Sequence, residues 1–586
     1  MGQGGRIFRP IMKTTENIAF EALRESVQVH LPDGRVISGN RGATVGEFLS
    51  LIEIDSTEPP IVGAIVNAEL RELTYPISFE STVEPVTMAM PDGMRIYRRS
   101  LTYLLEAAFG ELFPDASLSI DHSIFSGGYY CQVDGRETLS DDELQALQKR
   151  MRDLVEQDLP FTRKQVPLDE AIQIFEKRGM RDKVSLLQHR QKDYLVLYQM
   201  GEHLEYHHGY MLASTGGLKW FALARANSGF TLGFPRRSNP TTLPKIETVP
   251  QILEAFQEYG KLLALLQIDN VGLLNDAIQE GRIREIILVS EALHERQVAA
   301  VAGQVAQHAE QARVVMVAGP SSSGKTTFSK RLSIQLLGYG LSPFPLELDR
   351  YFVDRDRTPV DEDGELDFED LQALNLERLN ADIQSLIAGK ETRLLHYDFL
   401  KGKSEEGEVH RLGEDQIVIM EGIHGLNPGL LPGISDDQTF RIYLSALTQL
   451  NLDRHNRVST TDTRLIRRIV RDARERGYSA QATIQRWESV RRGEKRNIFP
   501  YQGNADVVFN SALVYELSAL KSLAEPLLRQ VPLGSPEHIE VKRLLALLDW
   551  FLPLDPEYIP DNSLLREFIG GSILSDFKVW QDHKEG

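Results

Sequence analysis

The chain has 586 residues, more than one hydrophobic core normally supports, so several domains are expected. Its hydrophobic content of 42% and charged content of 25% are typical of a soluble protein. The net charge of −19 argues against a protein that coats nucleic acid with its whole surface. No apolar run is as long as a membrane span, and no signal-peptide core is present. One cysteine, Cys131, excludes an internal disulfide, so a reducing cytoplasm is expected.

The charge is unevenly distributed. Residues 454–496 contain 13 Lys and Arg against 5 Asp and Glu, a net charge of +8. The other residues of this −19 chain therefore carry −27. A basic segment in an acidic protein indicates a local anionic partner or a purely structural role.

The first predicted elements form a small sheet. Residues 1–23 are expected to be a tail. After Ser26, VQVHLPDGRVISGNRGATVGEFLSLI predicts two strands joined by a Pro-Asp-Gly turn, then a capped helix that begins near Thr44. Two or three further short strands follow up to residue 93, so a sheet crossed by one helix is expected.

These segments resemble modules of aminoacyl-tRNA synthetases. LPDG, ATVGEFL and VNAELRELTYPI are similar to the TGS domain, a β-grasp module of threonyl-tRNA synthetases and some GTPases. SLTYLLEAAFGELFPDA, SGGYYCQVDG and LSDDELQALQKRMRDLVEQDLPF resemble the second additional domain of threonyl- and alanyl-tRNA synthetases. The resemblance implies a β-grasp domain at 24–93 and an α+β domain at 94–235.

The synthetase editing residues are replaced in this chain. Editing domains use an H-x-x-x-H pair, which falls here on Arg99 and Tyr103, and a C-x-x-x-H pair, which falls on His207 and Met211. The resemblance therefore implies a scaffold or binding module without hydrolytic activity. His203 and His207, spaced i and i+4, and His208 leave a metal site open as an alternative to polar side chains on an exposed face.

The next predicted segments connect two halves of the chain. RRSNPTTLPKIETVP, residues 236–250, is rich in Pro and Thr and predicts a linker. The segments up to residue 310 repeat apolar residues at three- and four-residue spacing, which predicts bridging helices.

A phosphate-binding loop follows. RVVMVAGPSSSGKTTFSK, residues 313–330, predicts a buried strand at 314–317, a Gly- and Ser-rich turn and a helix over 325–337. The turn matches G-x-x-x-x-G-K-[ST]. Its N–H groups would hold the phosphates of ATP, Lys325 would reach the outer phosphates, and Thr326 would bind Mg²⁺. The alternative is a Gly-rich turn without a ligand. The expected ATP-binding residues of the loop are Gly319, Ser321, Ser322, Ser323, Gly324, Lys325, Thr326 and Thr327.

Carboxylates end the next two predicted strands. PFPLELD ends at Asp349, and DQIVIMEGIHGL contains a strand at 417–420 that is followed by Glu421. Ligands of parallel sheets collect at the carboxyl ends of the strands, so both acids are expected near the phosphates. Asp349 could accept a proton or bind Mg²⁺ through water, and Glu421 could be the second Mg²⁺ anchor. The alternatives are a capping Asp349 and a solvent-exposed Glu421.

Arg464, Arg467, Arg468 and Arg471 are spaced i, i+3, i+4 and i+7, which places them on one face of a predicted helix. Crowded guanidiniums repel each other unless an anion lies among them, and their forks match phosphoryl oxygens. We therefore expect a lid that closes over ATP. The alternative is a solvated helix face.

In this order, GPSSSGKTT, LELDRYF, DFEDLQALN, HYDF, IMEGIHGL and RLIRRIVRDARERGYS resemble the uridine kinase and phosphoribulokinase family of P-loop kinases, over residues 311–511. The resemblance implies that Asp349 is the catalytic base and that Thr326 and Glu421 serve Mg²⁺. It assigns Lys325, Arg467 and Arg471 to catalysis, Arg468 and Arg476 to ATP, and Arg464, Glu369, Tyr397 and Asp398 to the substrate.

One position departs from the uridine kinase pattern. Uridine kinases carry a base-reading histidine three positions after the Phe of YDF, where this chain has Gly402. A glycine side chain offers the pyrimidine edge nothing, so uridine specificity is not implied. His396 and Lys401 are the alternatives for this role.

The sequence thus predicts an α/β chain with a doubly wound P-loop domain, preceded by the two synthetase-like domains and followed by a helical extension at 512–586. As a whole it resembles a type of multidomain bacterial protein that joins a TGS module and a synthetase-like second additional domain to a uridine kinase-like domain. We expect an ATP- and Mg²⁺-dependent kinase that phosphorylates the 5′-hydroxyl of a nucleoside, uridine- or cytidine-like, or of a related sugar alcohol. The alternative is an RNA- or tRNA-linked regulatory ATP-binding protein. A small-molecule substrate is favoured over nucleic acid, a membrane is not expected, and a homo-oligomer is left open.

Overall fold

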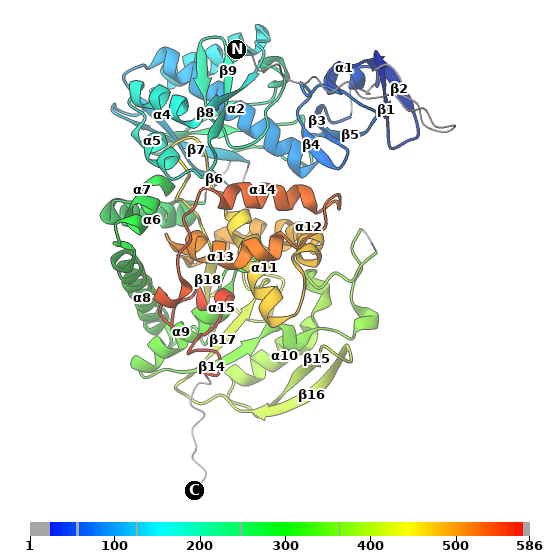
Figure 1. Cartoon of the computed structure of the whole chain (residues 1–586). Coiled ribbons are helices and arrows are strands. Elements are labelled where there is room, and N and C mark those ends of the chain that lie inside the picture. Colours follow the sequence, from blue (N-terminus) through cyan, green and yellow to red (C-terminus); the bar gives the residue numbers. More distant parts are fainter. Residues whose placement is uncertain are drawn as a thin grey trace, which may run out of the picture.

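A computed structural model describes residues 24–53, 55, 58–124, 127–246, 249–362 and 364–577. The chain forms an N-terminal half, a linker with bridging helices, and a second half built on a parallel sheet (Figure 1). This mixed α/β architecture confirms the predicted fold class. Over the ranges given above, no helix is both long and apolar enough to cross a bilayer. The predicted tail at 1–23 lies outside the described residues.

The first domain is a five-stranded sheet in the order β2-β1-β5-β3-β4, with one short helix against it. Thr44 caps this helix together with Glu47, as the sequence predicts. Its buried residues Val45 and Phe48 pack with Val29 and Ala64 of the strands. The elements are β1 (Ser26–His30), β2 (Val36–Asn40), α1 (Val45–Leu49), β3 (Ile61–Val66), β4 (Glu69–Arg71) and β5 (Ser81–Thr87).

The second domain is organised by α2 (Pro91–Leu112), which runs through its core. Tyr97, Leu101, Leu104 and Ala108 repeat at helical spacing and are fully buried. Two antiparallel sheets, β11-β12-β7-β6 and β10-β9-β8, share a hydrophobic core with this helix. The other elements are β6 (Ser117–Ile124), β7 (Gly128–Asp134), α3 (Asp141–Glu156), β8 (Thr162–Pro167), α4 (Leu168–Lys177), α5 (Arg181–Gln188), β9 (Tyr194–Met200), β10 (His203–Glu205), β11 (Ala222–Ala226) and β12 (Gly229–Gly233).

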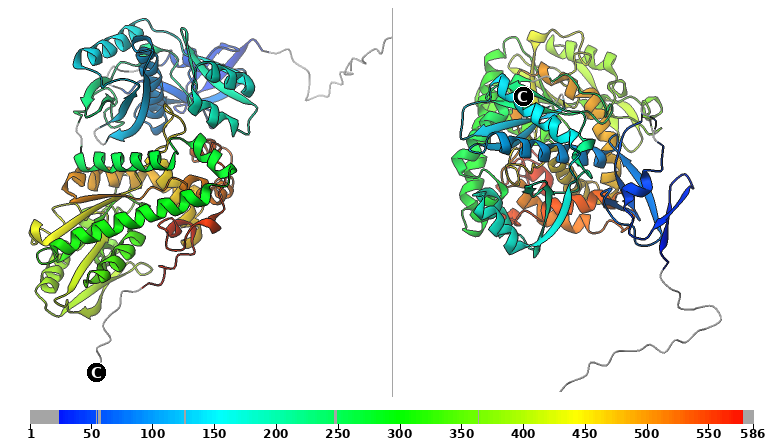
Figure 2. Two further views of the ribbon diagram at one scale, coloured as in Figure 1. Left: turned by 90° about the vertical axis from the view of Figure 1, so that its left-hand side faces the viewer. Right: turned by 90° about the horizontal axis from the view of Figure 1, so that it is seen from above.

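Three helices connect the halves: α6 (Pro250–Leu266), α7 (Val271–Gln279) and α8 (Ile283–His308). In the left view of Figure 2, α6 lies directly beneath the N-terminal half, and the long α8 runs obliquely across the second half. Apolar residues of α8 such as Val298 and Val305 are buried in the same core as Phe328 of the following helix. The bridging helices therefore join the two halves through packed side chains.

The second half contains a parallel sheet in the order β14-β17-β13-β18-β19. All five residues of its central strand β13 are buried, because side chains cover both faces of the sheet. The elements are β13 (Val314–Ala318), α9 (Lys325–Gly338), β14 (Ser342–Glu347), α10 (Leu376–Ile387), β15 (Thr392–Asp398), β16 (Lys403–His410), β17 (Gln416–Gly422), β18 (Thr439–Ser445), α11 (Thr460–Glu475), α12 (Ala480–Asn497) and β19 (Val507–Asn510). The P-loop strand and helix each run one residue beyond their predicted ends.

The C-terminal segment folds back between the halves. It consists of α13 (Glu516–Leu528), α14 (His538–Leu548) and α15 (Arg566–Ile569). In Figure 1, α14 lies beneath the N-terminal half, and its Lys542 pairs with Glu69. Arg543 of the same helix pairs with Asp462 at 2.7 Å. This extension therefore contacts both halves.

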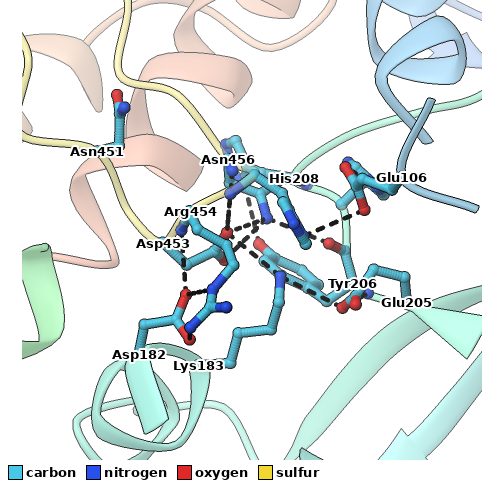
Figure 3. A network of polar contacts seen from close by, with 12 residues as sticks. Glu106, Asp182, Lys183, Glu205, Tyr206, His208, Asn451, Asp453, Arg454 and Asn456 are labelled. Atoms are coloured by element: carbon cyan, nitrogen blue, oxygen red, sulfur yellow. Dashed lines mark hydrogen bonds and ion pairs between the residues drawn. The ribbon is translucent and has the colours of Figure 1, made fainter. Parts of the chain in front are cut away.

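A buried polar network joins the halves through the loop between β18 and α11 (Figure 3). Lys183 lies 3.2 Å from a carboxylate oxygen of Glu205 and 3.2 Å from one of Asp453, and all three side chains are essentially inaccessible to solvent. Arg454 donates two hydrogen bonds of 3.0 Å to Asp182. Breaking such a pair leaves an uncompensated buried charge, so the halves are held in one arrangement.

Candidate active site

The loop between β13 and α9 requires glycine at two positions. A Cβ on Gly319 would lie 2.0 Å from the carbonyl oxygen of Leu444, and a Cβ on Gly324 would lie 2.4 Å from the Leu564 side chain. Gly324 also has φ of +92°, in the left-handed region that favours glycine. The backbone of the loop can therefore lie close to both neighbours.

The first two side chains of α9 contact the loop and the sheet. The Lys325 ammonium donates to the carbonyl oxygens of Gly319 (3.0 Å) and Pro320 (3.2 Å). The Thr326 hydroxyl donates to Glu421 at 2.7 Å. A hydroxyl and a carboxylate from adjacent elements form an oxygen pair of the kind that Mg²⁺ prefers. The donor set therefore fits Mg²⁺.

Two strand-end acids face this pair. Because β14 pairs in parallel with β17, Glu347 lies opposite Glu421. Asp349 follows β14 in a 3₁₀ turn, Leu348–Tyr351, two residues beyond the strand end. The Asp349 side chain is solvent-accessible but enclosed by protein, and this desolvation, together with Glu347, raises its pKa. The positive charges of Lys325 and Arg476 act to lower the pKa of Asp349, so the P-loop lysine is near enough to attract this carboxylate.

Two glutamates of the site hold protons more tightly than usual. Desolvation raises the pKa of Glu421 to about 7, against the attraction of Lys325 and the hydrogen bond from Thr326. Desolvation and the neighbouring Glu494 raise the pKa of Glu369 to about 7. Both acids would be stabilised as anions by a cation in the site.

The arginine stripe of α11 does not form a solvated face, so that alternative is wrong. Arg464 and Arg467 are 1% and 0% exposed. Arg464 pairs with Glu494, and the Arg467 Nε lies 2.6 Å from Glu516. The helix-surface pattern could not show these partners, because they lie 30 and 49 residues away in the sequence.

The stripe contacts the P-loop directly. Arg464 donates to the carbonyl oxygen of Ser321 (3.0 Å), Arg467 to that of Ser322 (3.4 Å), and Arg468 to the Ser321 hydroxyl (2.8 Å). The structure thus brings these three predicted residues to the nucleotide-binding loop.

Arg471 and Arg476 form ion pairs with the same acid, Asp472. Asp472 is 1% exposed and lies 3.0 Å from Arg471, 3.3 Å from Arg476 and 3.2 Å from Arg468. Arg471 also opposes the charge of Lys325. Arg471 therefore lies near the P-loop lysine.

Two carboxylates that sequence reasoning missed accept hydrogen bonds from the loop backbone. Glu494 accepts from the Ser321 N–H, and Glu567 of α15 accepts from the Thr327 N–H, each at 3.1 Å. They lie 173 and 240 residues from these donors, so no local pattern indicates them. Backbone N–H groups of this loop and helix are the groups that bind phosphate in P-loops.

Two of the predicted substrate residues, Tyr397 and Asp398, lie at the end of β15, which packs against the turn that carries Asp349. Tyr397 is buried with its ring centre 5.6 Å from that of Phe352. Asp398 accepts from the backbone N–H groups of Leu400 (2.9 Å) and Lys401 (3.0 Å), and so caps the turn between β15 and β16. The negative charge of Glu369 acts to raise the pKa of Lys325, and the pKa of Glu369 is in turn lowered by Lys325 and raised by Asp349.

Gly402 has a structural role that explains the absence of a side chain. Its φ is +68°, and a Cβ there would lie 2.7 Å from the Arg355 guanidinium. Lys401 pairs with Asp398 and Glu405. His396 is exposed and alternates with the buried Tyr397 along β15, so the two side chains point to opposite faces. His396 therefore points away from Tyr397, the neighbouring residue predicted to line the substrate site.

The three candidate metal-binding histidines do not form a ligand set. The His207 ring lies 3.2 Å from Glu106, and His208 accepts from the Trp550 indole at 3.2 Å. Across the part of the chain that the structure describes, the group with metal-ligand spacing is Glu106, Glu205 and His455, which includes none of the three. Lys183 already provides the positive charge beside Glu205 (Figure 3).

Comparison with known proteins agrees with this geometry. Residues 314–518 match the model of the phosphoribulokinase / uridine kinase family. This match supports a P-loop kinase domain in that region, and it does not determine a substrate. Among solved structures, similarity is found to a possible uridine kinase from Bacillus stearothermophilus (18% identity, TM-score 0.23, 34% of this chain and 89% of that chain). Another is D-glycerate 3-kinase from Cryptococcus neoformans (18% identity, TM-score 0.20, 45% and 89%).

The N-terminal part is similar to threonyl-tRNA synthetases. Threonine–tRNA ligase 2 of Bacillus subtilis is 28% identical over 213 residues, which are 36% of this chain and 33% of that protein. The threonine–tRNA ligase of Halorhodospira halophila is 31% identical over 206 residues, 35% and 32% of the two chains. The chain spans about a third of the length of these curated relatives.

Proposed function

We propose that residues 311–511 transfer the γ-phosphate of ATP to the 5′-hydroxyl of a nucleoside or a related sugar alcohol. One arrangement supports this most strongly. The Thr326 hydroxyl of the P-loop contacts Glu421, and Asp349 at the end of the adjacent strand lies within the field of Lys325. A phosphate cradle, a Mg²⁺ oxygen pair and a candidate base at one sheet edge are the parts that phosphoryl transfer to a hydroxyl requires.

The residues divide into three roles. The loop amides and Lys325 would hold the phosphates of ATP, and Thr326 and Glu421 would hold Mg²⁺. When bound, Mg²⁺ would neutralise charge on the transferred group. Asp349 would accept the proton of the substrate hydroxyl, and its raised pKa makes it a stronger base than an ordinary aspartate.

The remaining charged residues would position the reactants. Arg471 and Arg476, held by Asp472, would stabilise the transferring phosphoryl oxygens. Glu369 and Tyr397 would line the acceptor site. Gly402 leaves no side chain to read a pyrimidine, so the acceptor is expected to be selected through its sugar hydroxyls more than through its base.

A panel assay tests the proposal. The full chain is incubated with Mg-ATP and nucleosides, sugars or sugar phosphates, and ADP release is measured with phosphorus NMR of the product. At least one hydroxyl compound should raise ADP formation above the rate with water alone and yield a phosphate monoester. Tight ATP binding with no stimulation by any acceptor would contradict the proposal.

A further inference from the structure

A large cavity lies between the N-terminal half and the kinase half. Its volume is about 1220 Å³, and residues of both halves and of α14 line it. The residues that line it include 17 Lys and Arg but only 5 Asp and Glu, which gives the lining a net charge of +12. The chain as a whole has a net charge of −19, so this concentration of cations is local and is not explained by composition.

Part of this charge is neutralised within the lining itself. Arg543 pairs with Asp462 at 2.7 Å, Arg95 pairs with Asp92 at 2.7 Å, and Arg237 pairs with Glu488. These pairs use three of the five acids, and a fourth, Glu69, pairs with both Arg71 and Lys542. Acids outside the lining pair with further cations, such as Glu494 with Arg464 and Asp370 with Arg496. They are consistent with an ordinary interface between domains, and they do not require a ligand.

Among the described residues, several cations of the lining form no ion pair with an acid of the lining, and we call four of them, Arg98, Arg457, Arg491 and Lys495, the cavity cations. Arg98 comes from α2, Arg457 from the loop before α11, and the other two from α12. Within the described ranges, the Arg98 Nε is buried without a hydrogen-bond partner. Arg491 lies 3.5 Å from Glu494, but that acid already serves Arg464. The cavity cations are therefore under-neutralised.

The cavity cations line one cavity and repel one another. Desolvation and the positive charges of Arg237 and Arg491 lower the pKa of Lys495 to about 8, and Arg98 contributes in the same direction. Desolvation lowers the pKa of Arg98, and Arg457 lowers it further. Bringing several phosphates among the cavity cations would relieve this repulsion.

Aromatic rings fix the orientation of two guanidiniums. Arg98 lies over Phe234 at 4.6 Å, and Arg457 lies over Tyr129 at 4.8 Å. Guanidiniums held flat in this way keep their N–H groups directed at oxygen acceptors. Phe256, Trp487 and Trp550 add apolar walls to the same cavity. Its volume of about 1220 Å³ exceeds the roughly 300–1,000 Å³ of ordinary small-ligand pockets, so a nucleotide with its phosphates fits.

We propose that this cavity binds a polyphosphorylated nucleotide, either free or at the 5′ end of an RNA. The cavity cations would bind the phosphates, and the aromatic walls would take the base. This site adjoins the kinase centre at Pro320 and Arg464. It is distinct from that centre, because Lys325, Thr326, Asp349 and Glu421 do not line it. The inference does not rest on the proposed kinase activity.

The same geometry connects the cavity with the P-loop. Arg491 and Lys495 lie on α12, which also carries Glu494, and Glu494 accepts the hydrogen bond from the Ser321 N–H. Phosphates that bind Arg491 compete with Glu494 for it, since the two side chains are 3.5 Å apart. Occupation of the cavity would therefore alter the contact that Glu494 makes with the nucleotide-binding loop.

Binding experiments on the full chain test the proposal in a Lys325→Ala background, which weakens nucleotide binding at the P-loop. The probes are a fluorescent nucleoside triphosphate and a 12-nucleotide RNA with a 5′-triphosphate. Lys495→Glu and Arg98→Gln remove cavity charge. Lys261→Glu is the matched control, because Lys261 is exposed on α6 and does not line the cavity.

We expect Lys495→Glu to weaken the binding of at least one probe about tenfold and Lys261→Glu to change it less than twofold. Tighter binding of the triphosphate identifies a free nucleotide as the ligand, and tighter binding of the RNA identifies an RNA end. Lys495 is exposed, so its variant should fold, and thermal melting verifies this. If neither probe binds at millimolar concentration, or if Lys495→Glu and Arg98→Gln bind as the control does, the proposal is wrong.

Discussion

The carboxylate of Glu567 accepts a hydrogen bond of 3.1 Å from the backbone N–H of Thr327, the third residue of the P-loop helix. Glu567 belongs to α15, and Leu564 just before it packs against Gly324. A negative charge thus lies at a helix N-terminus where a phosphate is expected to bind. The C-terminal segment and ATP are therefore expected to compete for one position.

Glu567→Ala should bind ATP more tightly than the unmodified chain, because it removes both the competing acceptor and the repulsion of phosphate. A hydrogen bond to a charged group contributes about 1.5–3 kcal/mol, so a gain of roughly ten- to a hundredfold is the upper range. Isothermal titration calorimetry with ATP measures it. The exposed Glu557→Ala is the control, and an unchanged or weaker affinity for Glu567→Ala would refute the competition.

Asp349→Asn should abolish proton acceptance while it keeps the size of the side chain. We expect ATP affinity within about threefold of the parent and turnover lower by roughly 10²–10⁴, the usual contribution of a general base. Steady-state kinetics with the best acceptor from the panel measure both. Asp356→Asn, on the exposed turn nearby, is the control and should retain activity. Turnover of Asp349→Asn within threefold of the parent would remove Asp349 from the mechanism.

The stability of the metal-free protein should depend on pH through Glu421. Its pKa is raised from 4.5 to about 7, so between these values the folded chain keeps a proton that the unfolded chain releases. The free energy of unfolding therefore falls as the pH rises through this window. Thermal melts at pH 5 and pH 7.5 should show a smaller difference for Glu421→Gln than for the parent. Equal differences in the two proteins would show that Glu421 does not titrate in this range.

Mg²⁺ should counteract this loss. Binding favours the ionised form of Glu421, so the stabilisation by Mg²⁺ should grow as the pH rises through about 7. Melts with and without Mg²⁺ at both pH values measure it. In Glu421→Gln the Mg²⁺ effect should be small at either pH, and a full effect there would place the metal elsewhere.

Glu494→Ala should destabilise the kinase half by about 3–5 kcal/mol, because it leaves the Arg464 guanidinium buried without its partner. Denaturant unfolding measures the loss. The double variant Arg464→Met/Glu494→Leu removes both charges and should recover much of the stability. If the double variant is as unstable as the single one, lost packing and not the unpaired charge is responsible.

Gly402→His should not create a uridine kinase. The left-handed φ of +68° and the contact that a Cβ would make with Arg355 both oppose any side chain. We expect a loss of roughly 1–3 kcal/mol in stability and no selective gain in uridine phosphorylation. Denaturant unfolding and a comparison of uridine with other acceptors measure these effects. A stable variant with increased uridine turnover would contradict this view of the turn.

The sequence predicts the parts of the site that depend on local patterns. The P-loop strand and helix at residues 314–318 and 325–338 follow from periodicity and from the glycine spacing, because these determine backbone geometry directly. Glu421 contacts Thr326 as expected, because parallel strands bring their carboxyl ends to one edge.

Other features depend on contacts between distant segments. A stripe of arginines at helical spacing is compatible with solvent or with buried partners, and only the fold shows that Arg464 and Arg467 meet Glu494 and Glu516. Likewise, Glu567 is one acid among many in the sequence until α15 brings it to the P-loop. The roles of the individual residues in phosphoryl transfer stay predictions until the variants above are measured.

The burial of Lys183 between Glu205 and Asp453 means that the two halves cannot be separated without changing the kinase half. A kinase fragment made by cutting at the linker would expose Asp453 and Arg454 to water and remove the partners that orient the loop leading into α11. The isolated piece would differ from the intact protein in the segment that positions its arginines. Phosphoryl-transfer rates measured on such a fragment would therefore be lower than those of the intact chain.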